Sequence, residues 1–166
     1  MNMYKTEIES PIGRLTLASD GLALTGLWME DQKYFASTMD PESIVDPTLP
    51  IFEETENWLH AYFAGAALPP LPNLAPKGSD FRQNVWKLLL KIPYGETRTY
   101  GMLAQELRET GISAAAQAVG GAVGHNPILI LIPCHRVLGA NGSLTGYAGG
   151  IDVKKQLLQL EGISYI

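Results

Sequence analysis

A proline-rich stretch divides this chain into two halves. Residues 66–78 (AALPPLPNLAPKG) contain four prolines in thirteen positions. Proline lacks a backbone N–H and fixes φ, so neither a helix interior nor a central strand accommodates such a run. With 166 residues, 46% of them hydrophobic, the chain is long enough for two small domains. We therefore predict one domain at 1–76 and a second at 77–166.

The first half has the pattern of an antiparallel sheet with a helix. Turn residues separate three expected strands, at 4–9, 14–19 and 22–29, which form a meander. A short helix is expected at 32–38. A longer helix carries Ile51 and Trp58 on an apolar face, has glutamates in its first turns, and ends at Gly65.

The second half has the pattern of a helical domain. Helices are expected at 80–92 with Ser79 as N-cap, at 100–107 with Thr99 as N-cap, at 114–123 with Ser113 as N-cap, and at 152–161. The second and third of these are short and joined by a tight turn at Gly111. This arrangement is a candidate helix-turn-helix.

The helix expected at 114–123 (AAAQAVGGAV) contains no Lys or Arg. A helix that reads the major groove needs several Arg, Lys, Asn or Gln side chains, and this one offers only Gln117. Gly120 and Gly121 each disfavour a helix by about 1 kcal/mol relative to alanine. Their presence indicates that something approaches the backbone closely. Two explanations stay open: tight packing inside the protein, or contact with the narrow minor groove of DNA.

Cys134 is the only cysteine of the chain, and it follows a buried strand-like run at 128–132 and Pro133. The thiolate is the nucleophilic form of cysteine, and a neighbouring imidazole or cation such as His135 or Arg136 favours it. The alternative is a small buried hydrophobe. A single cysteine and three histidines without ligand spacing predict no metal site.

Charge is distributed unevenly along the chain. Residues 1–76 hold 3 Lys and Arg against 11 Asp and Glu, whereas residues 77–166 hold 9 against 6. A basic second half indicates a polyanionic partner for that half, and on charge alone scatter in composition is an equally good explanation. There is no long apolar run and the first ten residues do not form a secretory signal, so we expect a cytoplasmic protein that does not enter membranes.

Five motifs follow one another in the second half. They are FRQNVW at 81–86, IPYGETRTYG at 92–101, AVGGAVGHNP at 118–127, IPCHRV at 132–137 and GSLTGYAGG at 142–150. In this order and spacing the chain closely resembles the O6-alkylguanine-DNA alkyltransferases, which remove alkyl groups from damaged guanine. The resemblance implies an α/β fold: an amino-terminal antiparallel sheet with helix, in ribonuclease-H-like style, and a helical, winged-helix-like carboxy-terminal domain. Residues 1–76 match only in general style.

The resemblance also implies a mechanism. Cys134 accepts the alkyl group irreversibly, His135 acts through a water as its base, Glu161 orients that histidine, and Asn126 is a hinge between the recognition helix and the active site. Activation of a thiol requires the nucleophile itself, a base, and a group that orients the base. No cofactor is needed. On its own, Glu161 would be a solvated surface charge, and its role requires the last helix to fold back.

The implied partner is double-stranded DNA containing O6-alkylguanine, bound by a monomer through the minor groove. Tyr100 would press on the phosphate beside the target and help rotate the nucleotide out, because a stacked base is out of reach. Backbone groups of Cys134, Val137 and Ala148 would line the guanine pocket, with Tyr147 as a lid. The complete set implied for substrate or DNA binding is Tyr100, Gln117, Val123, Arg136, Val137, Tyr147 and Ala148.

One position departs from the family pattern. The family usually carries an arginine in the recognition helix, and this chain has Gln117 there. Glutamine fills space and hydrogen-bonds, but it brings no charge to the phosphates. A first rival function is therefore lesion recognition with weak or no transfer, although relatives of that kind replace the cysteine. A second rival is a cysteine hydrolase or redox protein that uses Cys134 and His135 on a small substrate.

Overall fold

A computed structural model of the chain describes residues 2–165, and these form two compact units. Unit 1 comprises residues 2–77 together with Pro127–Leu129, and unit 2 comprises residues 78–126 and 130–165. The chain therefore leaves unit 2 after Asn126, contributes three residues to unit 1, and returns to unit 2 four positions before Cys134.

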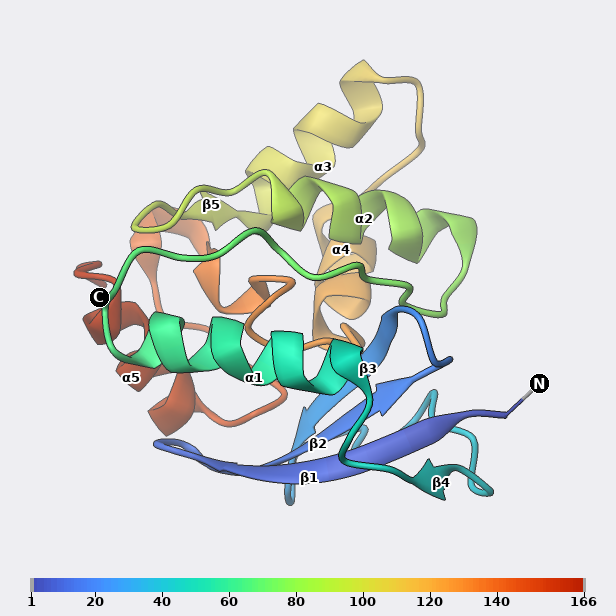
Figure 1. Cartoon of the computed structure of the whole chain (residues 1–166). Helices are drawn as coiled ribbons and strands as arrows, with labels where there is room; N and C mark the ends of the chain where they lie inside the picture. Colours follow the sequence, from blue (N-terminus) through green and yellow to red (C-terminus); the bar gives the residue numbers. More distant parts are fainter. Residues whose placement is uncertain (1, 166) are drawn as a thin grey trace. The chain divides into compact units, whose positions relative to one another are not determined.

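Unit 1 contains a four-stranded sheet in the order β3-β2-β1-β4 (Figure 1). The strands β1 (Tyr4–Ser10), β2 (Gly13–Ser19) and β3 (Leu24–Met29) pair antiparallel, which confirms the predicted meander. A two-residue strand β4 (Ile44–Val45) adds parallel to β1. No sequence pattern predicted β4, because two exposed residues are too few to show an alternation.

Helix α1 (Pro50–Phe63) covers the sheet of unit 1 with its apolar face. Trp58 and Tyr62 stack within it at 5.5 Å between ring centroids. Proline at the first helical position and Gly65 at φ +67° just beyond the end are favourable terminal residues, so the predicted helix is confirmed.

The helix predicted at 32–38 is wrong. This segment consists of turns, and Tyr34 and Ala36 have φ of 61° and 53°, outside the right-handed helical region. The Gln32 side chain accepts a hydrogen bond from the Met29 backbone N–H (2.7 Å) and donates to the Lys33 carbonyl (3.0 Å). Such local side-chain bonds replace the backbone bonds that a helix would form.

Unit 2 is built from four α-helices and shorter elements. The helices are α2 (Asp80–Leu90), α3 (Tyr100–Glu109), α4 (Ala116–Gly124) and α5 (Ile151–Leu160). Two 3-10 turns, η1 (Cys134–Arg136) and η2 (Ala140–Gly142), and the short parallel pair β5 (Arg98–Thr99) and β6 (Val137–Leu138) connect them. Across the described residues, the helices are all too short or too polar to span a membrane.

Side-chain caps fix the starts of two helices of unit 2. The hydroxyls of Ser79 and Thr99 accept from the backbone N–H groups of Arg82 (3.3 Å) and Met102 (3.1 Å), as predicted. The cap predicted at Ser113 is wrong, because α4 begins only at Ala116. Arg108 donates to the Ala114 carbonyl (2.8 Å), and Ala114 lies in the irregular segment that precedes the helix.

The buried run at 128–132 is not a strand beyond its first residue. Leu27 of β3 donates to the Pro127 carbonyl (2.8 Å) and accepts from the Leu129 N–H (3.1 Å), which leaves Ile128 as an isolated bridge within unit 1. The chain then turns, with Ile130 at φ 71°. The apolar residues are buried as expected, but burial alone does not distinguish a strand from a packed turn.

Candidate functional site

Cys134 begins η1 and is buried, with 3% of its surface exposed. Burial raises the pKa of its thiol to about 11, because a thiolate is poorly solvated there. A hydrogen bond from the Asn126 amide and the positive charge of Lys154 act in the opposite direction. The resting thiol is therefore protonated at neutral pH.

His135 lies next to Cys134 and forms a buried pair with Glu161. Its Nε2 lies 2.6 Å from Glu161 Oε2, and both side chains are fully buried. Burial lowers the pKa of His135, and the carboxylate only partly opposes this. In the neutral ring the Nε2–H donates to Glu161, which leaves Nδ1 as the acceptor nitrogen. The pair therefore presents a neutral, oriented imidazole.

Glu161 is held by two further donors in unit 2. Its Oε1 accepts from Arg136 Nε (2.8 Å) and from the Gly95 N–H (3.0 Å). The last helix does fold back, so the prediction that Glu161 reaches His135 agrees with the geometry and its interpretation as a surface charge is wrong. Leu157 and Leu158 are buried on α5, and their burial draws the end of this helix inward.

Arg136 was predicted to contact substrate or DNA, and the structure shows it buried. The residue is 7% exposed. Besides Glu161, its guanidinium donates to the Ile92 carbonyl (2.7 Å). It also lies over the ring of Tyr94, 5.7 Å from the centroid. These internal contacts engage the guanidinium and support Glu161, and the predicted contact of Arg136 with substrate or DNA stays a prediction.

Asn126 connects the end of α4 to the cysteine. It is buried, and its Nδ2 donates to the Ile132 carbonyl (2.8 Å) in addition to its hydrogen bond with Cys134. The Asn126 amide thus contacts both Cys134 and the backbone two residues before it. This geometry fits the predicted hinge between recognition helix and active site, which stays a prediction.

The glycine-rich loop at 142–150 lies against Tyr100. The Tyr100 hydroxyl lies 3.2 Å from Thr145 Oγ1, and burial raises the pKa of the phenol. The residues predicted to form the lid and the pocket wall, Tyr147 and Ala148, are half-buried in this loop, whereas Val137 is completely buried in β6. Their predicted roles toward guanine remain predictions.

Lys154 belongs to this cluster and was missed by the sequence reasoning. It is completely buried on α5, and its Nζ donates to the carbonyls of Val137 (2.7 Å) and Thr145 (3.3 Å). The sequence contained one signal that Lys154 is buried. Lys154, Leu157, Leu158 and Glu161 recur at helical spacing, so the apolar face of α5 already contained a lysine.

Helix α4 presents a surface of small residues and one polar side chain. Gln117 is exposed, whereas Val123, which was predicted to bind substrate or DNA, is buried with 6% exposed. A Cβ on Gly120 would lie 3.8 Å from the Tyr100 ring, but one on Gly121 would meet nothing within 4 Å. A distance of 3.8 Å is ordinary van der Waals contact, so internal packing requires a glycine at neither position.

Trp86 attaches α4 to the rest of unit 2. Its indole N–H donates to the Ala122 carbonyl (2.9 Å), and the ring is buried. A Cβ on Gly78 would collide with this ring, so the glycine at the end of the connector allows the tryptophan to reach its position. The FRQNVW motif thus positions α4, the second helix of the predicted helix-turn-helix.

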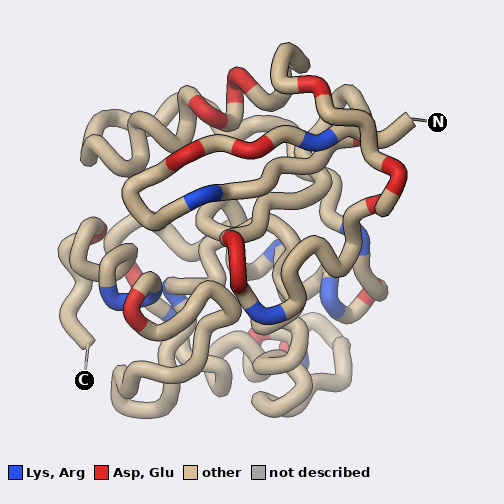
Figure 2. Tube along the Cα trace, turned by 90° about the horizontal axis from the view of Figure 1, so that it is seen from below, with Lys and Arg blue, Asp and Glu red and all other residues tan. Residues whose placement is uncertain are grey.

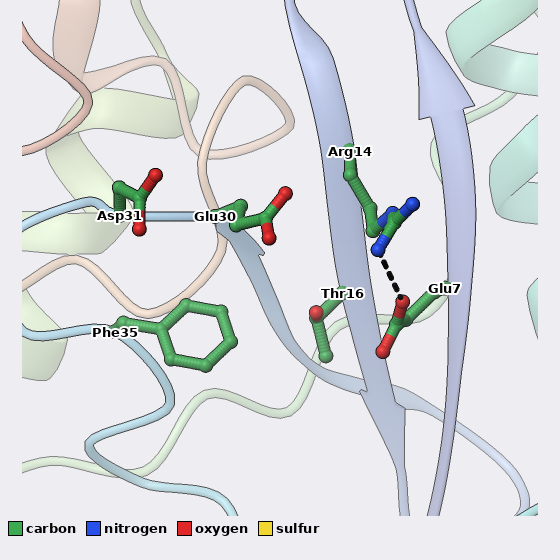
Figure 3. A pocket seen from close by; sticks show the side chains of 6 residues that line it. All are labelled: Glu7, Arg14, Thr16, Glu30, Asp31 and Phe35. Atoms are coloured by element: carbon green, nitrogen blue, oxygen red, sulfur yellow. Dashed lines mark ion pairs between the residues drawn. The ribbon is translucent and has the colours of Figure 1, made fainter.

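A pocket of about 330 Å³ lies on unit 1, lined by Glu7, Arg14, Thr16, Glu30, Asp31 and Phe35 (Figure 3). Arg14 is paired there with Glu7 (3.6 Å) and outside it with Glu9 (3.0 Å). None of the predicted site residues lines this pocket. Within residues 2–165, no group of three or more His, Cys, Asp or Glu is placed to hold a metal. We therefore assign the candidate site to the surroundings of Cys134.

Lys and Arg are sparse along unit 1 (Figure 2), in agreement with the counts for residues 1–76. In the second half, two of the nine cations, Arg136 and Lys154, are buried and cannot contribute directly to a binding surface. The basic surplus available to a polyanion is therefore smaller than the sequence suggests.

Comparison with known proteins gives consistent matches to both halves. Residues 3–69 match the 6-O-methylguanine DNA methyltransferase ribonuclease-like domain, and residues 80–163 match the DNA binding domain of the same family. A methylated-DNA–protein-cysteine methyltransferase of Mycobacterium tuberculosis is 51% identical over 95% of this chain and 91% of its own. A second relative, from Methanosarcina acetivorans, is 47% identical, and the match covers 96% of this chain and 99% of that protein.

Solved structures agree with these matches. The crystal structure of Mycobacterium tuberculosis OGT in complex with DNA superimposes with a TM-score of 0.83 at 48% identity, covering 97% of this chain and 92% of that one. The structure of an O6-methylguanine DNA methyltransferase from Methanococcus jannaschii superimposes with a TM-score of 0.67 at 29% identity. The match covers 97% of this chain and 95% of that one.

Fold and site together define a two-domain transferase whose reactive group is a cysteine. The chain belongs to the family of methylated-DNA–protein-cysteine methyltransferases. The predicted family, fold class and enzyme class are confirmed.

Proposed function

We propose that this protein repairs DNA by transferring a methyl or larger alkyl group from O6 of guanine to Cys134, once per molecule. The observation that carries the proposal is the buried array of Cys134, His135 and Glu161, with a 2.6 Å bond between the last two. A thiol beside an oriented, neutral imidazole is the arrangement required for nucleophilic attack by sulfur.

In the proposed reaction the Cys134 thiol gives up its proton to the His135 base, through a water. The thiolate attacks the alkyl carbon, so the S–C bond forms as the C–O6 bond breaks, and the electron pair leaves with guanine. The proton held by His135 then passes to the dealkylated guanine. The products are an S-alkyl cysteine and unmodified guanine, and the thioether has no path back to the thiol. The protein is therefore consumed.

The proposed partner is double-stranded DNA, bound in its minor groove by α4. Gln117 and Gly121 are exposed on this helix, and small residues permit close approach to a narrow groove. Tyr100 begins α3 and contacts the loop of Tyr147, where an extruded guanine would enter. We further propose that the protein acts as a monomer in the cytoplasm.

A mass measurement tests the transfer. The protein is incubated with duplex DNA containing O6-methylguanine, and one added methyl group on the peptide that contains Cys134 is expected. Cys134→Ser is the matched control and gains no methyl. An unmodified Cys134 after prolonged incubation with excess substrate would contradict the proposal. Repeated turnover of a small substrate would instead indicate a cysteine hydrolase.

Gln117 favours one alternative, which is lesion recognition with weak or no transfer. An exposed glutamine brings no charge to the phosphates, so extrusion of a stacked base would be inefficient. Tight binding of the lesion-containing duplex without methylation of Cys134 would support this alternative.

A further inference from the structure

Lys154 is a completely buried cation that has no carboxylate partner within the described part of the chain. Both hydrogen bonds of its ammonium go to backbone carbonyls. A buried charge is costly unless an opposite charge or several hydrogen bonds compensate it. The nearby Glu161 carboxylate is already occupied by His135 and Arg136. The lysine is therefore left without an anion in the resting protein.

The two carbonyls that Lys154 contacts belong to two different segments of unit 2. Val137 O (2.7 Å) belongs to β6, directly after the cysteine turn, and Thr145 O (3.3 Å) belongs to the glycine-rich loop. Thr145 also contacts the Tyr100 hydroxyl through its own Oγ1 (3.2 Å). One ammonium group thus ties the loop that carries Tyr147 to the segment that carries the nucleophile.

The group that gains negative charge during the reaction is Cys134, and it interacts electrostatically with Lys154. The other ionisable groups of this cluster are His135, Arg136, Glu161 and Tyr100. Desolvation lowers the pKa of Lys154 to about 8, and the charge of Lys154 also acts to lower the pKa of His135. At neutral pH the lysine therefore remains mostly protonated beside a neutral imidazole.

We propose that Lys154 is a positioning residue of the alkyl transfer, which holds the glycine-rich loop on β6 and places a positive charge opposite the Cys134 thiolate as it forms. This role rests on the proposed function. The lysine keeps its proton throughout: the thiol proton leaves toward His135, the S–C bond forms, and the C–O6 bond breaks. In the resting protein the thiol is neutral, the thiolate that forms during the reaction is the anion that pairs with Lys154, and after transfer the thioether is neutral.

The experiment uses the single cysteine as a reporter. The rate of alkylation of Cys134 by iodoacetamide is measured from pH 6.5 to 10 in the wild type, Lys154→Gln, Lys154→Met and Lys154→Arg, beside methyl transfer from duplex DNA. Lys155→Met is the matched control, because it removes the neighbouring lysine of the same helix. Thermal unfolding verifies that each variant is folded. Glutamine retains a donor for the two carbonyls without charge, which separates the electrostatic role from the structural one.

Removal of the charge is expected to raise the pKa of the thiol by about one unit, so alkylation and methyl transfer at pH 7 both slow about tenfold in Lys154→Gln. The difference from the wild type shrinks above pH 8, because there the wild-type lysine also loses its charge. Lys154→Arg recovers most of the alkylation rate, and Lys155→Met matches the wild type. If Lys154→Met does not fold, the alkylation rates of Lys154→Gln and Lys154→Arg still compare a neutral with a charged side chain at this position.

Two results would overturn the proposal in different ways. Wild-type methyl transfer with an unchanged iodoacetamide profile in folded Lys154→Gln would refute the role of Lys154 alone. Absence of methyl transfer by the wild type would refute the proposed function, and this role with it, whatever the alkylation profile.

Discussion

The surroundings of Cys134 and the surface of α4 are built on opposite principles. Around the cysteine, His135, Arg136, Lys154 and Glu161 are all buried and bonded to one another or to backbone carbonyls. On α4 the exposed positions carry a glutamine and small residues, and a hydrogen bond from the Trp86 indole to the Ala122 carbonyl attaches this helix to α2. The side chains around Cys134 are held by contacts within the protein, whereas the exposed side chains of α4 are available to a partner.

This difference determines what each region tolerates. In the buried cluster each polar group satisfies another, so replacing one member leaves its partner unsatisfied or charged in an apolar environment. On α4 an exposed residue such as Gln117 can change without disturbing the core. A departure from the family pattern at Gln117 is therefore compatible with an intact reactive centre.

The largest effect is expected when the buried cluster is broken at Glu161. Glu161→Gln removes the charge that balances Arg136 and weakens the bond to His135, so we expect a loss of about 3–5 kcal/mol in the free energy of unfolding. Methyl transfer should fall as well, because the imidazole loses its orientation. Urea denaturation measures the first effect. Glu106→Gln on the exposed face of α3 is the control and should change stability by less than about 0.5 kcal/mol. Equal stability of the two variants would contradict this account of the cluster.

A smaller effect is expected on the surface of α4. Gln117→Arg supplies a charge to the phosphates and a planar group for the base stack, so repair of duplex DNA should accelerate about tenfold, equivalent to about 1.4 kcal/mol. Reaction with the free O6-methylguanine base should be unchanged, because no base has to be extruded. The two rates are compared by single-turnover methyl transfer.

Gln156→Arg, which adds the same charge at an exposed position of α5, is the control for non-specific attraction to DNA. An equal acceleration by this control, or of both substrates by Gln117→Arg, would mean that Gln117 does not limit base extrusion.

The smallest effect concerns pH. Burial lowers the pKa of His135 below its ordinary value of about 6.5, so the unfolded chain binds more protons than the folded one below that pH. Stability is therefore expected to fall as the pH drops below about 6.5, by roughly 1 kcal/mol at pH 5.5. Urea denaturation at pH 7.5 and 5.5 measures it. His135→Gln should lose this part of the pH dependence, whereas His60→Gln, on the exposed surface of α1, should retain it.

Local signals in the sequence were sufficient for most of the fold. The meander followed from turn residues, and the starts of α2 and α3 followed from Ser79 and Thr99, since a cap and its helix are neighbours in the chain. The errors lie where non-local or unusual local contacts decide. Gln32 holds its own backbone in turns, and Arg108 donates to the Ala114 carbonyl just ahead of α4.

The reactive centre was predictable in part. Motifs indicated Cys134, His135 and Glu161, but the burial of Arg136 and of Lys154 was not foreseen, and both omissions have one cause. A sequence shows the charge of a side chain and not its burial, and charged residues are usually exposed. Both side chains are buried because each finds carbonyl acceptors far away in the chain, Ile92 for Arg136 and Val137 for Lys154.

The two hydrogen bonds of Leu27 to the segment at Pro127–Leu129 have a consequence for cooperativity. The segment Pro127–Leu129 belongs to the β-sheet unit, whereas residues 130–133, between this segment and Cys134, belong to unit 2. Opening of the sheet would release the chain five positions ahead of Cys134, so folding of the first half bears on the segment that leads toward the thiol. Substitutions in the core of the sheet can thus silence repair without touching the reactive centre.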